Sequence, residues 1–174
     1  FRIFFDPFTF VAGNPALQPA ITDGLKLEYK FKTYFLSLNF SHDDNAIARF
    51  VPIINPETNE SFVTSQNLNF RNTISLIATL PVYIGNWWEM QNNIIASWQE
   101  LKYDYTGTPL YLSQKAISIN STQTFKLPKD FTIEFSGFFN SPQFGWGISK
   151  GEAMGKLNIG LQKKFKKSRS TLRL

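Results

Sequence analysis

The residues best suited to metal binding or proton transfer lie in two short polar segments. The one histidine, His42, is followed directly by Asp43 and Asp44, and such a set can ligate a metal or move protons. No second His and no Cys completes a common transition-metal set, so a polar strand end is the favoured interpretation. The acidic and amide segment at residues 55–60 matches no calcium-loop pattern, and we interpret it as a solvated turn.

The segment at residues 141–151 is the candidate for ligand binding. It places Phe144 and Trp146 among glycines and a proline, and exposed aromatic rings on such a loop can contact a glycan or a chelate. Phe144 and Trp146 are therefore the predicted ligand-binding residues, and the alternative is a loop packed against its neighbours. The sequence shows no catalytic triad, phosphate loop or dinucleotide fingerprint. We expect a protein that is not an enzyme and that needs no metal or cofactor.

The composition of the chain indicates what kind of protein carries these residues. The chain has 174 residues with a net charge of +5, and 16% of them are aromatic. A single soluble domain of this length would struggle to bury so many rings. No apolar run approaches the ~18 residues of a membrane-spanning helix, which leaves membrane-spanning strands open. The chain begins at Phe1 without a signal peptide, so we expect a fragment or processed piece of a longer protein.

Alternation of apolar and polar residues is the dominant pattern. In residues 25–32, Leu25, Leu27, Tyr29 and Phe31 alternate with charged residues, which predicts a strand with two unlike faces. Similar segments predict seven strands and a stub, at residues 22–32, 34–50, 66–80, 87–105, 111–126, 131–140 and 152–165, then from 171 onward. Residues 1–21 would supply the end of a leading strand and a proline loop. Short and long spacers alternate, so we predict an all-β, antiparallel up-and-down meander within one segment, residues 1–174.

Two features favour a transmembrane β-barrel over a soluble sheet. The predicted strands exceed the usual 5–6 residues, and aromatic residues gather near the short turns, as in a membrane-interface girdle. One face should then be apolar and carry Leu25, Leu27, Tyr29, Phe31, Leu36, Leu38, Leu157, Ile159 and Leu161. The opposite face should carry Lys26, Glu28, Lys30, Asn158 and Gln162. The basic segment at residues 163–169 would then be a turn near anionic headgroups, so no nucleic-acid partner is expected.

Several short motifs resemble those of one protein family. Asp6-Pro7, Gly13-Asn14-Pro15-Ala16-Leu17-Gln18-Pro19 and Glu28-Tyr29 resemble a pattern of Bacteroidetes-type outer-membrane β-barrel proteins, the barrel portions of TonB-dependent receptors. The turn and strand at residues 126–134 and the segment at residues 160–165 are also similar to that family. The resemblance covers essentially the whole chain and implies a bacterial outer-membrane location. It also implies that the loop at residues 13–19 lies on the side of the cell exterior, with the loop at residues 141–151 and opposite the tight turns.

The resemblance further implies a role in nutrient import. Large barrels of this class close with about 22 strands, so this segment would form about a third of the wall. The intact protein would take up an iron chelate or an oligosaccharide, and outer-membrane lipid would surround it. The TonB complex would act through a plug domain, which we expect to be absent from this chain. One alternative is a passive or structural outer-membrane barrel without TonB coupling. A second is a soluble β-sandwich that binds carbohydrate.

Overall fold

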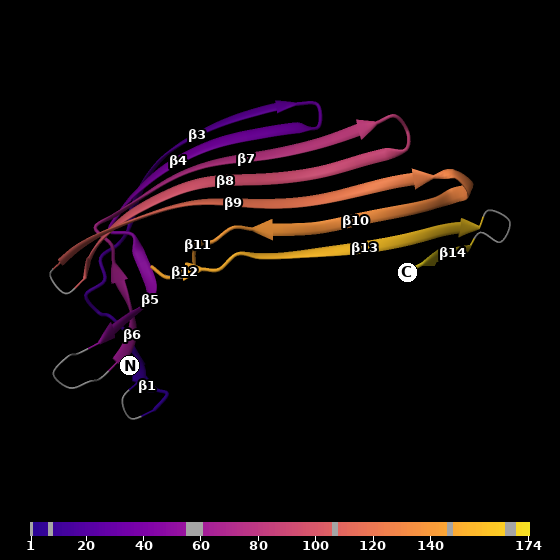
Figure 1. Cartoon of the computed structure of the whole chain (residues 1–174). Coiled ribbons are helices and arrows are strands. Elements are labelled where there is room, and N and C mark those ends of the chain that lie inside the picture. Colours follow the sequence, from indigo (N-terminus) through magenta and orange to yellow (C-terminus); the bar gives the residue numbers. More distant parts are fainter. Residues whose placement is uncertain (1, 7–8, 55–60, 106–107, 146–147, 166–169) are drawn as a thin grey trace.

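One long, curved antiparallel sheet dominates the computed structural model, which describes residues 2–6, 9–54, 61–105, 108–145, 148–165 and 170–174 (Figure 1). Its eight strands run in the order β14-β13-β10-β9-β8-β7-β4-β3. Their bounds are β3 (Ile21–Phe31), β4 (Tyr34–Asp44), β7 (Phe70–Ile84), β8 (Trp88–Tyr105), β9 (Thr108–Leu127), β10 (Phe131–Asn140), β13 (Met154–Phe165) and β14 (Ser170–Arg173). The predicted all-β antiparallel meander is confirmed. Among the described residues, no helix is long and apolar enough to cross a membrane.

Tight turns and long connections lie at opposite ends of this sheet (Figure 1). The tight turns follow β3, β7 and β9, and the last of them holds a single 3-10 turn, η1 (Pro128–Asp130). Gly85 adopts a φ of +54° in the turn before β8, a conformation that favours glycine. The proline loop at residues 13–19 precedes β3, and the described part of residues 141–151 follows β10. Both therefore lie at the long-connection end, as predicted.

The register gives the sheet two chemically distinct faces. Leu27 pairs with Leu38, and Leu38 pairs with Leu76; directly paired residues share a face. The same register continues through β8, β9 and β10 to β13, where Gly137 pairs with Leu157. The predicted common face is confirmed for Leu25, Leu27, Tyr29, Phe31, Leu36, Leu38, Leu157, Ile159 and Leu161. We call this the apolar face, and the opposite one, with Lys26, Glu28, Lys30, Asn158 and Gln162, the polar face.

A second sheet takes up parts of two strands that the sequence predicted as continuous. Its order is β1 (Arg2–Phe4), β2 (Thr9–Ala12), β6 (Ser61–Asn67) and β5 (Ile47–Ile54). The strand predicted at residues 34–50 is wrong in its continuity, because β4 ends at Asp44 and Asn45 adopts a φ of 53°, which redirects the chain into β5. The strand predicted at residues 66–80 is likewise divided, since β6 ends at Asn67 and β7 begins at Phe70. A two-stranded ribbon, β11 (Gln143–Phe144) with β12 (Lys150–Gly151), completes the fold.

Hydrogen bonds tie the proline loop to the second sheet. Asn14 Nδ2 donates to the carbonyl oxygen of Ser65 at 3.0 Å. The amide of Asn67 accepts from the Gln18 backbone N–H at 2.8 Å and donates to the Gln18 carbonyl oxygen at 2.9 Å. The loop before β3 is thereby held by the Asn67 side chain and the Ser65 carbonyl oxygen of β6, in addition to the restriction that its two prolines impose.

The buried core of the chain is small and lies at the long-connection end. Among the described residues, its cluster consists of Ala46, Ala48, Val51, Leu68, Leu101 and Tyr103, and Phe10 and Ala78 are buried elsewhere. Leu101 and Tyr103 belong to the polar face of β8, so β5 and its neighbours cover that face at this end. The apolar face is left open, with Leu25 72% exposed and Leu157 71% exposed. A sandwich would bury its apolar face between two sheets, so the soluble sandwich is wrong.

Candidate functional site

Neutral hydrogen-bonding side chains cover much of the polar face. Asn39 Nδ2 donates to Ser75 Oγ at 3.4 Å across β4 and β7. Thr79 Oγ1 donates to Asn93 Oδ1 at 2.9 Å across β7 and β8. These groups bond to one another along the sheet and present amides and hydroxyls to the space above it. Such a surface suits contact with water, with sugar hydroxyls or with polar protein segments.

A pocket in this face lies beside the ribbon of β11 and β12. Its volume is about 200 Å³, and it is lined by Thr73, Ser97, Gln99, Gln114, Ala116, Gln143 and Phe144. Gln99 Nε2 donates to Thr73 Oγ1 at 3.2 Å, and Gln114 Nε2 donates to the carbonyl oxygen of Pro142 at 2.9 Å. Amides and hydroxyls are thus fixed next to an aromatic ring, and no charged side chain lines the pocket.

Phe144, one of the two predicted ligand-binding residues, has a packing role as well. It is partly buried and packs against the core cluster that includes Val51, Leu101 and Tyr103. Its ring therefore fixes β11 over the polar face and forms one wall of the pocket. Contact between Phe144 and a ligand stays a prediction. Trp146 lies outside the described residues, as does the segment at residues 55–60.

The segment from His42 to Asp44 does not assemble into one site, because its residues alternate between faces. Arg71 reaches Asp43 Oδ2 through Nε at 2.8 Å and Nη2 at 2.7 Å, on the polar face. His42 lies on the other face, with Nδ1 2.6 Å from Asn72 Oδ1 and Nε2 3.3 Å from Asp44 Oδ1. Within the described part of the chain, no group of three His, Cys, Asp or Glu residues is suited to a metal ion.

The apolar face is bounded by aromatic rings at the tight-turn end and by hydrogen-bonding side chains at the long-connection end. At the tight-turn end, the ring centroids of Trp88 and Phe125 are 5.3 Å apart, and those of Trp87 and Trp88 are 5.7 Å apart. At the long-connection end, Asn72 Nδ2 reaches Glu100 Oε2 at 3.5 Å, and Trp98 Nε1 donates to Ser113 Oγ at 3.0 Å. Between these borders the face spans residues 88–98 on β8, the length with which a tilted strand crosses a bilayer, about 9–11 residues.

A comparison with protein families indicates the environment of the apolar face. The model of the outer membrane protein β-barrel family matches residues 1–174. The chain belongs to that family. Neither the search of curated proteins nor the search of solved structures gave a significant match.

Membership of the outer membrane protein β-barrel family assigns the two faces to two environments. The location is the bacterial outer membrane. The apolar face contacts lipid, and the polar face lines the interior of the barrel. Short turns of such barrels lie in the periplasm and longer loops lie outside the cell, so the rings around Trp88 form the periplasmic girdle. The pocket beside Phe144 then opens on the interior near the outer end.

This outer-membrane barrel segment also has a polar network on its lipid-facing side. Ser121 Oγ donates to Asn92 Oδ1 at 2.8 Å, Gln123 Nε2 donates to Ser121 Oγ at 2.8 Å, and Trp88 Nε1 donates to Gln123 Oε1 at 2.9 Å. Mutual bonding reduces the cost of placing these amides and this hydroxyl against lipid. Sequence reasoning missed the network, although weak alternation between residues 112 and 125 was a signal for it.

Proposed function

We propose that the intact protein is an outer-membrane receptor that takes up a neutral oligosaccharide, with energy supplied by the TonB complex through a plug domain inside the barrel. The pocket formed by Gln99, Gln114 and Phe144 is the observation that carries the proposal. In it, amide and hydroxyl groups are available for sugar hydroxyls, and one aromatic ring is available for the apolar face of a sugar. The role is binding and transport, without catalysis.

The lining of the pocket favours a sugar over an iron chelate. Ferric chelates that carry negative charge are best held by Arg or Lys, which form charge-assisted hydrogen bonds. Gln99, Gln114 and Gln143 instead offer uncharged donors and acceptors. A neutral ligand with many hydroxyls satisfies both kinds of group at once.

The shape of the main sheet supports a wide barrel. Within the described residues, β3 and β14 stand at the two ends of the strand order, and the eight strands form an open arc (Figure 1). Additional strands are therefore needed to close the wall, and outer-membrane transporters of about 22 strands hold a plug in the lumen. The polar interior offers hydrogen-bonding partners to such a plug.

Ligand titration of the full-length protein in detergent tests the choice of substrate. The probes are a panel of neutral α-linked and β-linked oligosaccharides, with ferric citrate as the chelate. We expect one oligosaccharide class to bind, and Gln99→Ala to weaken its binding about tenfold, the effect of losing a hydrogen-bonding partner in a desolvated site. Gln91→Ala, an amide change on the same strand and face, serves as the control and should leave binding unchanged. Binding of ferric citrate alone would contradict the proposal.

Energy coupling separates the receptor from a passive barrel. A TonB-dependent receptor should support growth on the bound oligosaccharide only in cells with a working TonB complex. It should also show no steady conductance in a planar bilayer, because the plug fills the lumen. Stable open-channel conductance together with TonB-independent growth would favour the passive alternative.

A further inference from the structure

A cleft opens on the lipid-facing surface at the tight-turn end of β10, β13 and β14. Its volume is about 270 Å³, and it is lined by Phe131, Leu161, Lys163, Phe165, Leu172 and Leu174. Every lining residue except Lys163 is apolar. The cleft therefore combines a hydrocarbon-like interior with one cation at the level of the periplasmic girdle.

Lys163 is held in a defined position beside this cleft. It pairs with Phe131 across β10 and β13 and with Leu172 across β13 and β14, so it lies on the lipid-facing side. Its Nζ is 4.2 Å from the centre of the Phe131 ring and 5.8 Å from that of Phe165, and it donates to the carbonyl oxygen of Lys129. These partners carry no negative charge, so no carboxylate among them competes with an anion for the ammonium.

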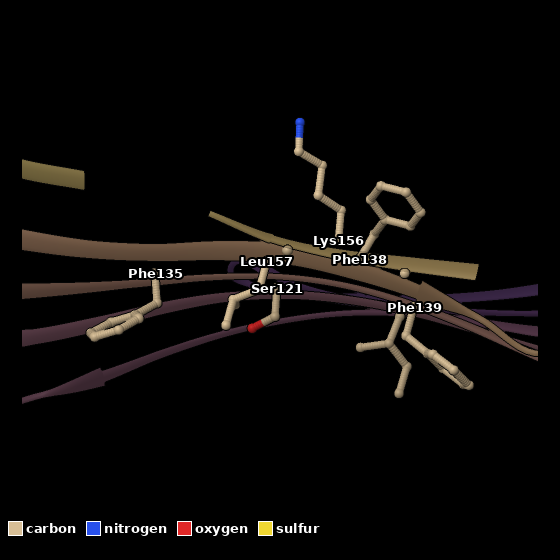
Figure 2. Close-up of a pocket in the computed structure, with 9 residues that line it drawn as sticks. Ser121, Phe135, Phe138, Phe139, Lys156 and Leu157 are labelled. Carbon is tan, nitrogen blue, oxygen red and sulfur yellow. The ribbon is translucent and has the colours of Figure 1, made fainter. Parts of the chain in front are cut away.

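A larger groove lies on the same face, farther from the tight turns. It has a volume of about 570 Å³ and includes Phe135, Gly137, Phe139, Gly155 and Leu157. Figure 2 shows Phe135, Phe139 and Leu157 on one side of the sheet and Lys156 and Phe138 on the other. The two glycines leave the space between the rings unfilled. Along β13, the apolar side chain of Ile159 lies between Leu157 of the groove and Leu161 of the cleft.

The dimensions of this path match one leaflet of a bilayer. Strands rise about 3.3 Å per residue, so the distance from Lys163 to Leu157 along β13 is about 20 Å. With a strand tilt of about 35–45°, the path descends about 15 Å, which is half of the ~30 Å hydrocarbon core. A molecule with a phosphate at the girdle and an acyl chain directed toward the membrane centre fits this path.

We propose that the lipid-facing surface of β10 and β13 binds one glycerophospholipid of the periplasmic leaflet. Its phosphate contacts the Lys163 ammonium, and one acyl chain lies along Leu161 and Ile159 toward the groove at Gly137. Periplasmic sidedness follows from the tight turns at this end of the sheet. This inference depends on the membrane placement of the chain and not on the substrate of the receptor.

Native mass spectrometry of the full-length protein tests the site. The delipidated protein is titrated with phosphatidylglycerol, phosphatidylethanolamine, lipopolysaccharide and a diacylglycerol that has the same chains but no phosphate. We expect both phospholipids to bind, and Lys163→Gln to weaken their binding about tenfold. Lys163→Arg should retain binding. Lys156→Gln removes the same charge from the opposite face of the same strand and should have no effect.

Other outcomes would overturn the proposal. If Lys163→Gln binds phospholipid as tightly as the unchanged protein, the ammonium has no role in binding. If the diacylglycerol binds as tightly as the phospholipids, the phosphate has no role. Retention of lipopolysaccharide alone would place the lipid in the outer leaflet. Should Lys163→Gln not fold, a phospholipid with a photoreactive acyl chain is cross-linked to the unchanged protein. Labelling concentrated on residues 131–139 and 157–163 is expected, and even labelling around the barrel would refute the site.

Discussion

At Gly137 the backbones of β10 and β13 approach closely. A Cβ atom at this position would lie 2.5 Å from the carbonyl oxygen of Lys156, a distance that requires the backbone to shift. At Gly160, on the opposite face of β13, the nearest atom would be 3.8 Å away, which is ordinary contact. Gly137 is therefore required by close strand packing, whereas Gly160 tolerates a side chain.

Alanine substitutions test this difference. We expect Gly137→Ala to lower the free energy of unfolding by about 1–3 kcal/mol through overpacking. Gly160→Ala should change it by less than about 0.5 kcal/mol. Denaturant titration of the full-length protein in detergent measures both, and equal effects of the two substitutions would contradict the packing account.

The polar network around Asn92 leads to a non-additive prediction. Asn92→Ala alone removes the acceptor of the Ser121 hydroxyl, and should lower the free energy of unfolding by about 1–2 kcal/mol. Replacing every side chain of the network with an apolar one, Trp88→Phe, Asn92→Leu, Ser121→Ala and Gln123→Leu, leaves no side-chain group of the network unsatisfied and should recover stability. The same titration compares both variants, and a fourfold variant less stable than Asn92→Ala would contradict this account of the network.

Strand faces were predictable from the sequence, but strand ends were not. Alternation is a local property, so the faces of β3, β4 and β13 follow directly from residues such as Leu27 and Leu157. The break at Asn45 and the second sheet depend on distant pairing, including the parallel contact of β2 with β6. The candidate site shows the same division. Phe144 stands out in the sequence, whereas Gln99 and Gln114 converge only because three strands adopt one register.

Arginine substitutions on β9 test the assignment of faces. Ile119 lies on the lipid-facing side and Asn120 on the interior side of the same strand. We expect Ile119→Arg to lower the free energy of unfolding by about 2–4 kcal/mol, the cost of arginine near the bilayer centre. Asn120→Arg faces water and should cost less than about 1 kcal/mol. The reverse order, measured in lipid vesicles, would show that the faces are inverted.

At the scale of the whole molecule, the open sheet requires an apolar environment. Edge strands β3 and β14 present unpaired backbone groups in the described structure, and Leu157 and Leu25 belong to a wide exposed apolar surface. Both features promote association in water. Residues 1–174 expressed alone should therefore aggregate without detergent, as measured by size-exclusion chromatography with light scattering. A monodisperse monomer in plain buffer would contradict the membrane assignment.

Sidedness in living cells tests the central claim most directly. The chain contains no Cys, so single cysteines at Ala16 in the proline loop and at Thr33 in the first tight turn provide two reporters, both exposed. In the full-length protein, with any cysteines outside this chain replaced, intact cells are treated with a membrane-impermeant thiol reagent. We expect labelling at Ala16→Cys and none at Thr33→Cys until the outer membrane is permeabilised. Labelling at Thr33→Cys but not at Ala16→Cys in intact cells would contradict the orientation of the barrel wall.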